Sequence, residues 1–264
     1  MTGAFGYIGS LLVNKLCQVC HVRAVDLAAP GALPDLPWTR HSNVEIQTAD
    51  LRDGKNLAPS VRNVDVIFHC AAQTSHYVAN QDPLTDFDAS CRPLLNLCDA
   101  LKAIETSPRI VLASSATVVG LTEQFPVDEE APCHPVTIYD CHKLACENYL
   151  SFYCAERGGQ AVALRLANVY GPVLRSTKTD RGILNLMCGR ALAGDPLTIF
   201  GDGQWLRDYV FIDDVVDSFL FAGSPRIAVD GFQVVNICTG TSHPFVDVAR
   251  RVAAIASSRT GRNV

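Results

Sequence analysis

The sequence predicts an α/β fold with a doubly wound parallel sheet. Short apolar runs alternate along the chain with longer amphipathic segments, which is the pattern of strands connected by helices. The run at 64–71 leaves little room for polar alternation, as expected of a strand that is buried on both faces. At 264 residues the chain is long enough for one to two domains. We expect a sheet domain over 1–170, to which 232–240 return, and a smaller α/β region over 171–264.

In the first part of the chain, short apolar runs predict strands, and apolar residues recurring every three to four positions predict helices. Pro93 lies inside a predicted helix and indicates a kink or a break there. Gly158 and Gly159 end another helix. The predicted strands are 21–27, 44–48, 64–71, 109–115 and 161–166, the predicted helices are 9–16, 86–104 and 137–157, and a loop rich in Pro and Gly is expected at 28–36.

After Pro172 the spacing of the apolar runs changes, and the elements become shorter. This change is the reason for placing the boundary between the two regions near residue 170. The predicted strands of the second region are 197–200, 208–211 and 233–237, and its predicted helices are 183–193, 213–221 and 245–256.

The composition excludes several classes of protein. With 22 Lys and Arg against 27 Asp and Glu, the chain lacks the basic excess of a nucleic-acid-binding protein. The apolar stretch at 110–122 is shorter than the roughly 20 residues that a membrane span needs. We see no secretory signal, so we expect a cytoplasmic protein whose 11 cysteines are reduced.

A glycine-rich turn opens the sequence. Gly3, Gly6 and Gly9 have the spacing that permits a tight turn, close approach of the backbone to a pyrophosphate, and close packing of the following helix. The N-terminus of that helix favours the phosphate charge. Asp26 follows at the end of the next strand, where a carboxylate can accept both ribose hydroxyls of an adenosine. This pattern predicts NAD as the cofactor and disfavours a 2′-phosphate.

Tyr139 and Lys143 lie four residues apart and therefore share one face of a predicted helix. A Lys ammonium near a Tyr hydroxyl stabilises the phenolate, which suits acid–base chemistry at an alcohol or a ketone. Ser114 and Ser115 end a buried strand, at the edge of the sheet where ligands bind in open α/β folds. We therefore predict Ser115, Tyr139 and Lys143 as catalytic residues.

Taken together, these residues resemble the extended short-chain dehydrogenase/reductases, and within them the NAD-dependent sugar-nucleotide epimerase/dehydratase family. The resemblance implies a Rossmann-type sheet and a substrate-binding region at 171–264. It runs over nearly the whole chain in order, through TGAFGYIG at 2–9, Asp26, ADL at 49–51, HCAAQ at 69–73, DPL at 82–84, SSATVVG at 114–120, YDCHK at 139–143, LRLANVYGP at 164–172, IFGDGQWLRDYVFIDDVV at 199–216 and NICTG at 236–240.

The resemblance also implies roles for individual residues. Tyr139 is then the base, Lys143 its partner and a ligand of the nicotinamide ribose, and Ser115 the residue bound to the reacting hydroxyl. Thr117 is expected to line the hexose pocket, Asn168 to contact the diphosphate and Arg207 to pair with a phosphate. The expected cofactor-binding residues are Gly3, Phe5, Gly6, Tyr7, Ile8, Gly9, Asp26, Asp50, Leu51, Ala71, Ala72, Gln73, Tyr139 and Lys143.

The resemblance implies epimerisation at C4 of a nucleotide-sugar, a UDP-hexose, through a transient 4-keto sugar. Ala116 and Thr117 stand where related 4,6-dehydratases carry an acidic pair, and related decarboxylases carry Glu at the position of Thr117. The segment therefore favours 4-epimerisation, with a dehydratase or a reductase of the same superfamily as the alternatives. The resemblance further implies a homodimer formed through the helices at 86–104 and 137–157.

Two departures from the family support a different hypothesis. An apolar strand precedes the glycine turn in the family, whereas this chain has only Met1 there, so we expect the first, central strand of the sheet to be missing. The chain also ends at Val264, before the segment that closes the substrate pocket. A truncated, non-catalytic NAD-binding module is therefore a second interpretation. His69 and His76 lack a third ligand, and we predict no metal site.

Overall fold

The computed structural model describes residues 1–27, 35–122, 125–174 and 182–262. Its larger sheet is parallel throughout and comes in two parts. A two-stranded part pairs β1 (Val22–Asp26) with β2 (Val44–Thr48). A four-stranded part has the order β3 (Val66–His69), β4 (Arg109–Ser115), β5 (Ala161–Leu166) and β8 (Phe232–Ile237).

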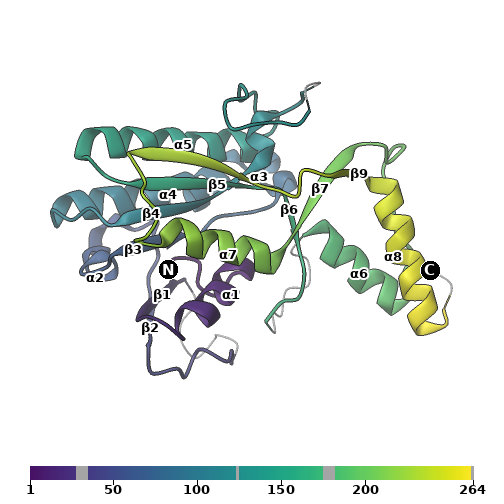
Figure 1. Cartoon of the computed structure of the whole chain (residues 1–264), viewed down its shortest axis with the longest axis horizontal. Coiled ribbons are helices and arrows are strands. Elements are labelled where there is room, and N and C mark those ends of the chain that lie inside the picture. The colour runs from purple at the N-terminus through teal and green to yellow at the C-terminus, as the bar shows by residue number, and fades with distance from the viewer. Residues whose placement is uncertain (28–34, 123–124, 175–181, 263–264) are drawn as a thin grey trace.

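Helices cover both faces of this sheet, which confirms the predicted α/β fold class (Figure 1). On one face α1 (Tyr7–Leu16) and α7 (Ile212–Gly223) pack on alternate residues of β4, among them Val111. On the other face α4 (Pro83–Ala103) and α5 (Ile138–Arg157) pack on the intervening residues, among them Ile110 and Leu112. Because every second side chain points to the opposite face, a strand buried on both faces must be apolar at nearly every position.

A smaller region projects from the sheet at the right of Figure 1. Its three-stranded sheet has the order β6 (Asn168–Tyr170), β7 (Leu206–Phe211) and β9 (Ser242–Pro244). The helices α6 (Ile183–Ala193) and α8 (Phe245–Thr260) enclose a small core there, formed around the buried side chains of Met187, Phe245 and Ala249. The domain boundaries remain a prediction.

The predicted elements agree with the observed ones except at two places. The strand predicted at 197–200 is wrong, because these residues form no ladder. Leu197 and Ile199 instead pack against the small core around Phe245, so their alternation reflects packing and not pairing. The break predicted at Pro93 is also wrong, since α4 continues through this buried residue. Most of the predicted loop, residues 28–34, lies outside the described residues.

Several short elements were not predicted. They are α2 (Ala58–Val61), α3 (His76–Gln81), the strands β6 and β9, and the 3-10 turns at Gly54–Asn56 and Ala116–Val119. Each is too short to show a hydrophobic period.

The gap left by the expected first strand lies between β1 and β3, and we call it the seam. Met1 and Thr2 close its carboxyl end, where Val25 N donates to Met1 O at 2.8 Å and Thr2 N donates to Phe68 O at 3.0 Å. Towards the amino ends of the strands, a cavity of about 300 Å³ is lined by residues that include Arg23 and Val64. The central strand is thus reduced to two residues, and its neighbours keep part of their backbone pairing.

The ammonium of Met1 is buried in the seam and donates to Arg23 O at 2.8 Å. Burial lowers its pKa from 8.0 to about 6. The unfolded chain therefore binds this proton more tightly, so the free energy of unfolding should rise between pH 6 and pH 8, by up to about 3 kcal/mol, and gain nothing more from this group at higher pH.

Urea unfolding at several pH values measures this slope. The control is the same chain acetylated at its N-terminus, which has no ammonium to titrate. An equal slope in the two chains would contradict the prediction.

Candidate active site

The glycine turn folds as close packing requires. Gly3 has a φ of +67°, and a Cβ there would lie 2.7 Å from Ala71 N, at the end of β3. A Cβ at Gly9 would collide with Gly3 O. Gly6 is the N-cap of α1, so the positive end of this helix faces the turn. The turn therefore brings exposed backbone next to the loop that follows β3.

Asp26 ends β1 beside this turn. Its Oδ2 accepts a hydrogen bond from Phe5 N at 2.9 Å, and its Oδ1 accepts one from Leu27 N at 2.8 Å. Each carboxylate oxygen has two lone pairs, so both oxygens can accept a further hydrogen bond from a ligand. The backbone thus holds the carboxylate in place while leaving it able to bind hydroxyl groups.

A cavity of about 390 Å³ opens between the glycine turn, the end of β1 and the loop after β3. Five predicted cofactor-binding residues do not line it: Tyr7, Ile8, Gly9, Tyr139 and Lys143. Tyr7 instead donates from its hydroxyl to Gly171 O at 2.9 Å. The predicted cofactor-binding residues that line this cavity are Gly3, Phe5, Gly6, Asp26, Asp50, Leu51, Ala71, Ala72 and Gln73.

Asp50 is held by a residue that sequence reasoning missed. Arg52, which also lines the cavity, donates from Nη2 to Asp50 Oδ2 at 2.7 Å and from Nε to Oδ1 at 2.9 Å. These hydrogen bonds lower the pKa of Asp50. The carboxylate is therefore ionised and engaged, and Arg52 places a guanidinium at the rim of the cavity.

The three predicted catalytic residues lie at the ends of neighbouring elements. Ser115 ends β4 and Lys143 lies on α5, and both are buried. Lys143 Nζ donates to Ala113 O at 2.9 Å and lies 5.7 Å from the centre of the Tyr139 ring. Lys143 and Tyr139 therefore lie near each other beside the end of β4, and their catalytic roles remain predictions.

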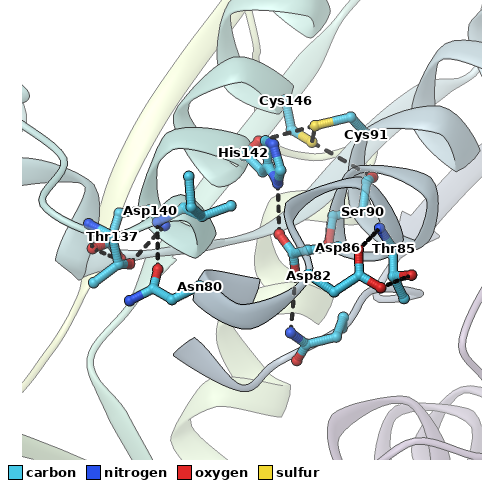
Figure 2. A network of polar contacts seen from close by, with 12 residues as sticks. Asn80, Asp82, Thr85, Asp86, Ser90, Cys91, Thr137, Asp140, His142 and Cys146 are labelled. Atoms are coloured by element: carbon cyan, nitrogen blue, oxygen red, sulfur yellow. Dashed lines mark hydrogen bonds and ion pairs between the residues drawn. The ribbon is translucent and has the colours of Figure 1, made fainter. Parts of the chain in front are cut away.

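Ser115 has polar partners that the sequence analysis did not predict. Ser115 Oγ lies 2.7 Å from Thr117 Oγ1, which donates to Asp140 Oδ1 at 2.5 Å. Figure 2 shows Asp140 at the start of α5 against Thr137. The signal was present in the sequence, because Thr137 followed three residues later by an acidic residue is a capping-box pattern.

A second buried carboxylate links α5 to the cavity beside the glycine turn. Asp86 on α4 is completely buried, and its Oδ2 lies 2.6 Å from His142 Nδ1 (Figure 2). Its Oδ1 accepts a hydrogen bond from Gln73 Nε2 at 2.9 Å. Asp86 therefore fixes the loop that carries Gln73 relative to α5.

The predicted diphosphate ligands lie in the smaller region. Asn168 Nδ2 donates to Asp208 O at 3.0 Å, which places Asn168 beside the strand that carries Arg207. Arg207 is exposed and donates to Leu206 O at 2.8 Å. The Asp208 carboxylate accepts hydrogen bonds from Thr239 N and Gly240 N and so fixes the following turn. Their roles towards a substrate remain predictions.

The described ranges contain neither a candidate metal-binding cluster nor a candidate membrane-spanning helix. No group of three or more His, Cys, Asp or Glu side chains there has an arrangement that could hold a metal ion. In the same ranges, every helix is too short or too polar to cross a membrane.

Comparison with known proteins identifies relatives along most of the chain. Residues 1–238 match the family described as the NAD dependent epimerase/dehydratase family. A UDP-glucose 4-epimerase from Mycolicibacterium smegmatis is 33% identical over 243 residues, which cover 91% of this chain and 76% of that protein.

Solved structures with the same fold are also similar in sequence. The UDP-glucose 4-epimerase of Thermotoga maritima, solved with UDP-glucose, has a TM-score of 0.84 at 27% identity. The match covers 100% of this chain and 82% of the Thermotoga chain. The UDP-glucose 4-epimerase of Thermus thermophilus, solved with NAD, has a TM-score of 0.81 at 28% identity, with coverage of 99% and 82%.

Proposed function

The chain belongs to the NAD dependent epimerase/dehydratase family, and from this membership we propose that it interconverts the C4 epimers of a UDP-hexose. The observation that carries the proposal is the arrangement of Ser115, Tyr139 and Lys143 at the carboxyl edge of the sheet that also forms the glycine-turn cavity. The similar structures solved with UDP-glucose and with NAD support the choice of substrate and cofactor.

The residues present fit NAD. Gly6 is the N-cap of α1 and lines the cavity, so the positive end of this helix suits a pyrophosphate. Each carboxylate oxygen of Asp26 accepts one backbone hydrogen bond and retains a lone pair for a ribose hydroxyl. When bound, NAD would supply a hydride acceptor and donor for C4 of the sugar.

The residues of the chain then handle the proton and the geometry. Tyr139 Oη accepts the proton of the C4 hydroxyl and gives it back once the 4-keto sugar has turned over in the pocket. Lys143 holds the phenolate form by its charge and is itself fixed by Ala113 O. Ser115 contacts the reacting oxygen, while Asn168 and Arg207 hold the diphosphate. Thr117 in place of an acidic residue favours epimerisation over elimination or decarboxylation.

Thermal melting with NAD, with UDP and with both tests the binding part of the proposal. Ligands at about 100 times their dissociation constant stabilise the native state by about 2.7 kcal/mol, which should raise the Tm by about 5–10 °C. Asp26→Ala is the matched variant, since it should lose the shift with NAD and keep the shift with UDP. Absence of any shift in the unmodified chain would contradict the proposal.

Interconversion of UDP-galactose and UDP-glucose tests the chemical part. We expect either substrate to yield a mixture of the two when NAD is present. A chain that melts higher with both ligands yet converts neither sugar would instead support the non-catalytic NAD-binding module.

A further inference from the structure

Asp140 is a carboxylate that helix capping explains only in part. Its side chain is 1% exposed, although it follows Tyr139 directly on α5. Oδ2 serves the cap by accepting hydrogen bonds from Thr137 N at 3.2 Å and from Thr137 Oγ1 at 2.7 Å (Figure 2). The cap makes no use of Oδ1, which points to a different partner.

That partner is Thr117, whose Oγ1 donates to Asp140 Oδ1 at 2.5 Å. A hydroxyl has one hydrogen, so Thr117 has none left for its other neighbour, Ser115. The hydrogen in the 2.7 Å contact between Ser115 Oγ and Thr117 Oγ1 must therefore come from Ser115. The charge of Asp140 thus sets the direction of two hydrogen bonds in sequence.

The groups around Asp140 present hydrogen-bond donors to its oxygens. The two threonine hydroxyls and Thr137 N all donate to it. His76 Nδ1 lies 3.8 Å from Asp140 Oδ1 and 3.3 Å from Thr137 Oγ1, and the His76 ring packs on the ring of Tyr139 at 4.4 Å between centroids. The hydrogen-bond donors around the carboxylate therefore all match oxygens that accept.

We propose that Asp140 is a positioning residue that turns the Ser115 hydrogen away from the reacting oxygen and towards Thr117. The inference rests on the proposed function. A Ser115 hydroxyl that donates to Thr117 holds the C4 carbonyl of a keto sugar less firmly. The carbonyl is then free to leave one face of the pocket and present the other, which epimerisation at C4 requires.

Asp140→Asn reverses the direction of the hydrogen bonds. The Asn oxygen stays with Thr137, because two donors face it there, so Nδ2 faces Thr117 and donates to it. Thr117 can then donate to Ser115, and the Ser115 hydrogen is free for the substrate. We expect the fraction of enzyme-bound sugar held as the 4-ketone to rise about tenfold, the effect of one hydrogen bond of ordinary net strength. We also expect kcat to fall and KM for the UDP-sugar to change little.

Quenching the enzyme–NAD–sugar mixture and reducing it with borodeuteride measures the ketone, since deuterium enters at C4 of any ketone present. Asp82→Asn is the matched control: Asp82 caps α4 by accepting from Thr85 N at 3.0 Å and Thr85 Oγ1 at 2.6 Å, and no contact joins it to Ser115. This variant should leave the ketone fraction unchanged.

Thr117→Val tests the same role without changing the helix cap. It should raise the ketone fraction, and adding Asp140→Asn to it should have no further effect, because both act through one hydroxyl. Wild-type ketone levels in Asp140→Asn and in Thr117→Val would overturn the role of Asp140 and leave the proposed function standing. A wild-type chain that interconverts no UDP-sugar would overturn the proposed function and this inference with it.

Discussion

Replacing Tyr139 by Phe should lower kcat for interconversion of the UDP-sugars by a factor of about 10²–10⁴, the usual contribution of a positioned acid–base group. The variant keeps the ring, its contact with His76 and its distance from Lys143, and loses only the oxygen that takes the proton. Steady-state kinetics in both directions measure the effect. The shift of Tm with UDP should stay as in the unmodified chain, because the proposed diphosphate ligands, Asn168 and Arg207, lie in the smaller region.

Tyr149→Phe is the matched control. Tyr149 lies on the same helix but is 39% exposed and faces away from the core. We expect its kcat to remain within about twofold of the unmodified chain, as for most exposed substitutions. Equal activities of Tyr139→Phe and Tyr149→Phe would exclude Tyr139 as the base.

The second large effect is expected at a buried ion pair behind the site. Arg165 on β5 and Glu147 on α5 are 4% and 2% exposed, and Arg165 Nη2 donates to Glu147 Oε2 at 2.8 Å. Glu147 also accepts from the Ser114 hydroxyl, next to Ser115, and Arg165 Nη2 contacts Cys133 Sγ at 3.2 Å. The pair therefore joins a strand, the catalytic helix and the segment around residue 133.

Glu147→Ala should lower the free energy of unfolding by about 3–5 kcal/mol, because it leaves the Arg165 guanidinium buried without its counter-charge. Urea unfolding measures the loss. The double variant Glu147→Leu with Arg165→Met removes both charges and should recover most of the stability. If the double variant were as unstable as Glu147→Ala, lost packing and not the unpaired charge would be the cause.

An exposed ion pair provides the comparison. Asp247 and Arg250 on α8 lie 3.3 Å apart with most of both side chains in solvent. Asp247→Ala should cost less than about 1 kcal/mol.

The strands and long helices could be predicted because burial fixes their residues. β4 is apolar at Ile110, Val111 and Leu112 since both of its faces are covered, and no other arrangement hides such a run. The glycine turn could also be predicted, because Gly3 and Gly9 lie where a side chain would collide with backbone. The sequence therefore indicated the sheet, the turn and the cavity between them.

The partners of the site could not be predicted from local pattern. The capping-box pattern marks Asp140 only as a residue at a helix start, and Asp86 looks like an ordinary polar helix residue. Packing against the turn after β4, the loop after β3 and a second helix makes them buried acceptors. The same limit explains the wrong strand at 197–200, where alternation comes from tertiary packing alone. Long-range contacts decide these features, and periodicity carries no information about them.

The seam makes the β1–β2 pair a separate unit of local unfolding. The β1–β2 pair meets the four-stranded part through Met1 and Thr2 rather than through a full ladder, so it can open while the rest stays folded. A dinucleotide that contacts both Asp26, at the end of β1, and Ala71, in the loop after β3, links the two units. Part of its binding free energy then goes into keeping them closed, so cofactor occupancy and the integrity of the sheet rise and fall together.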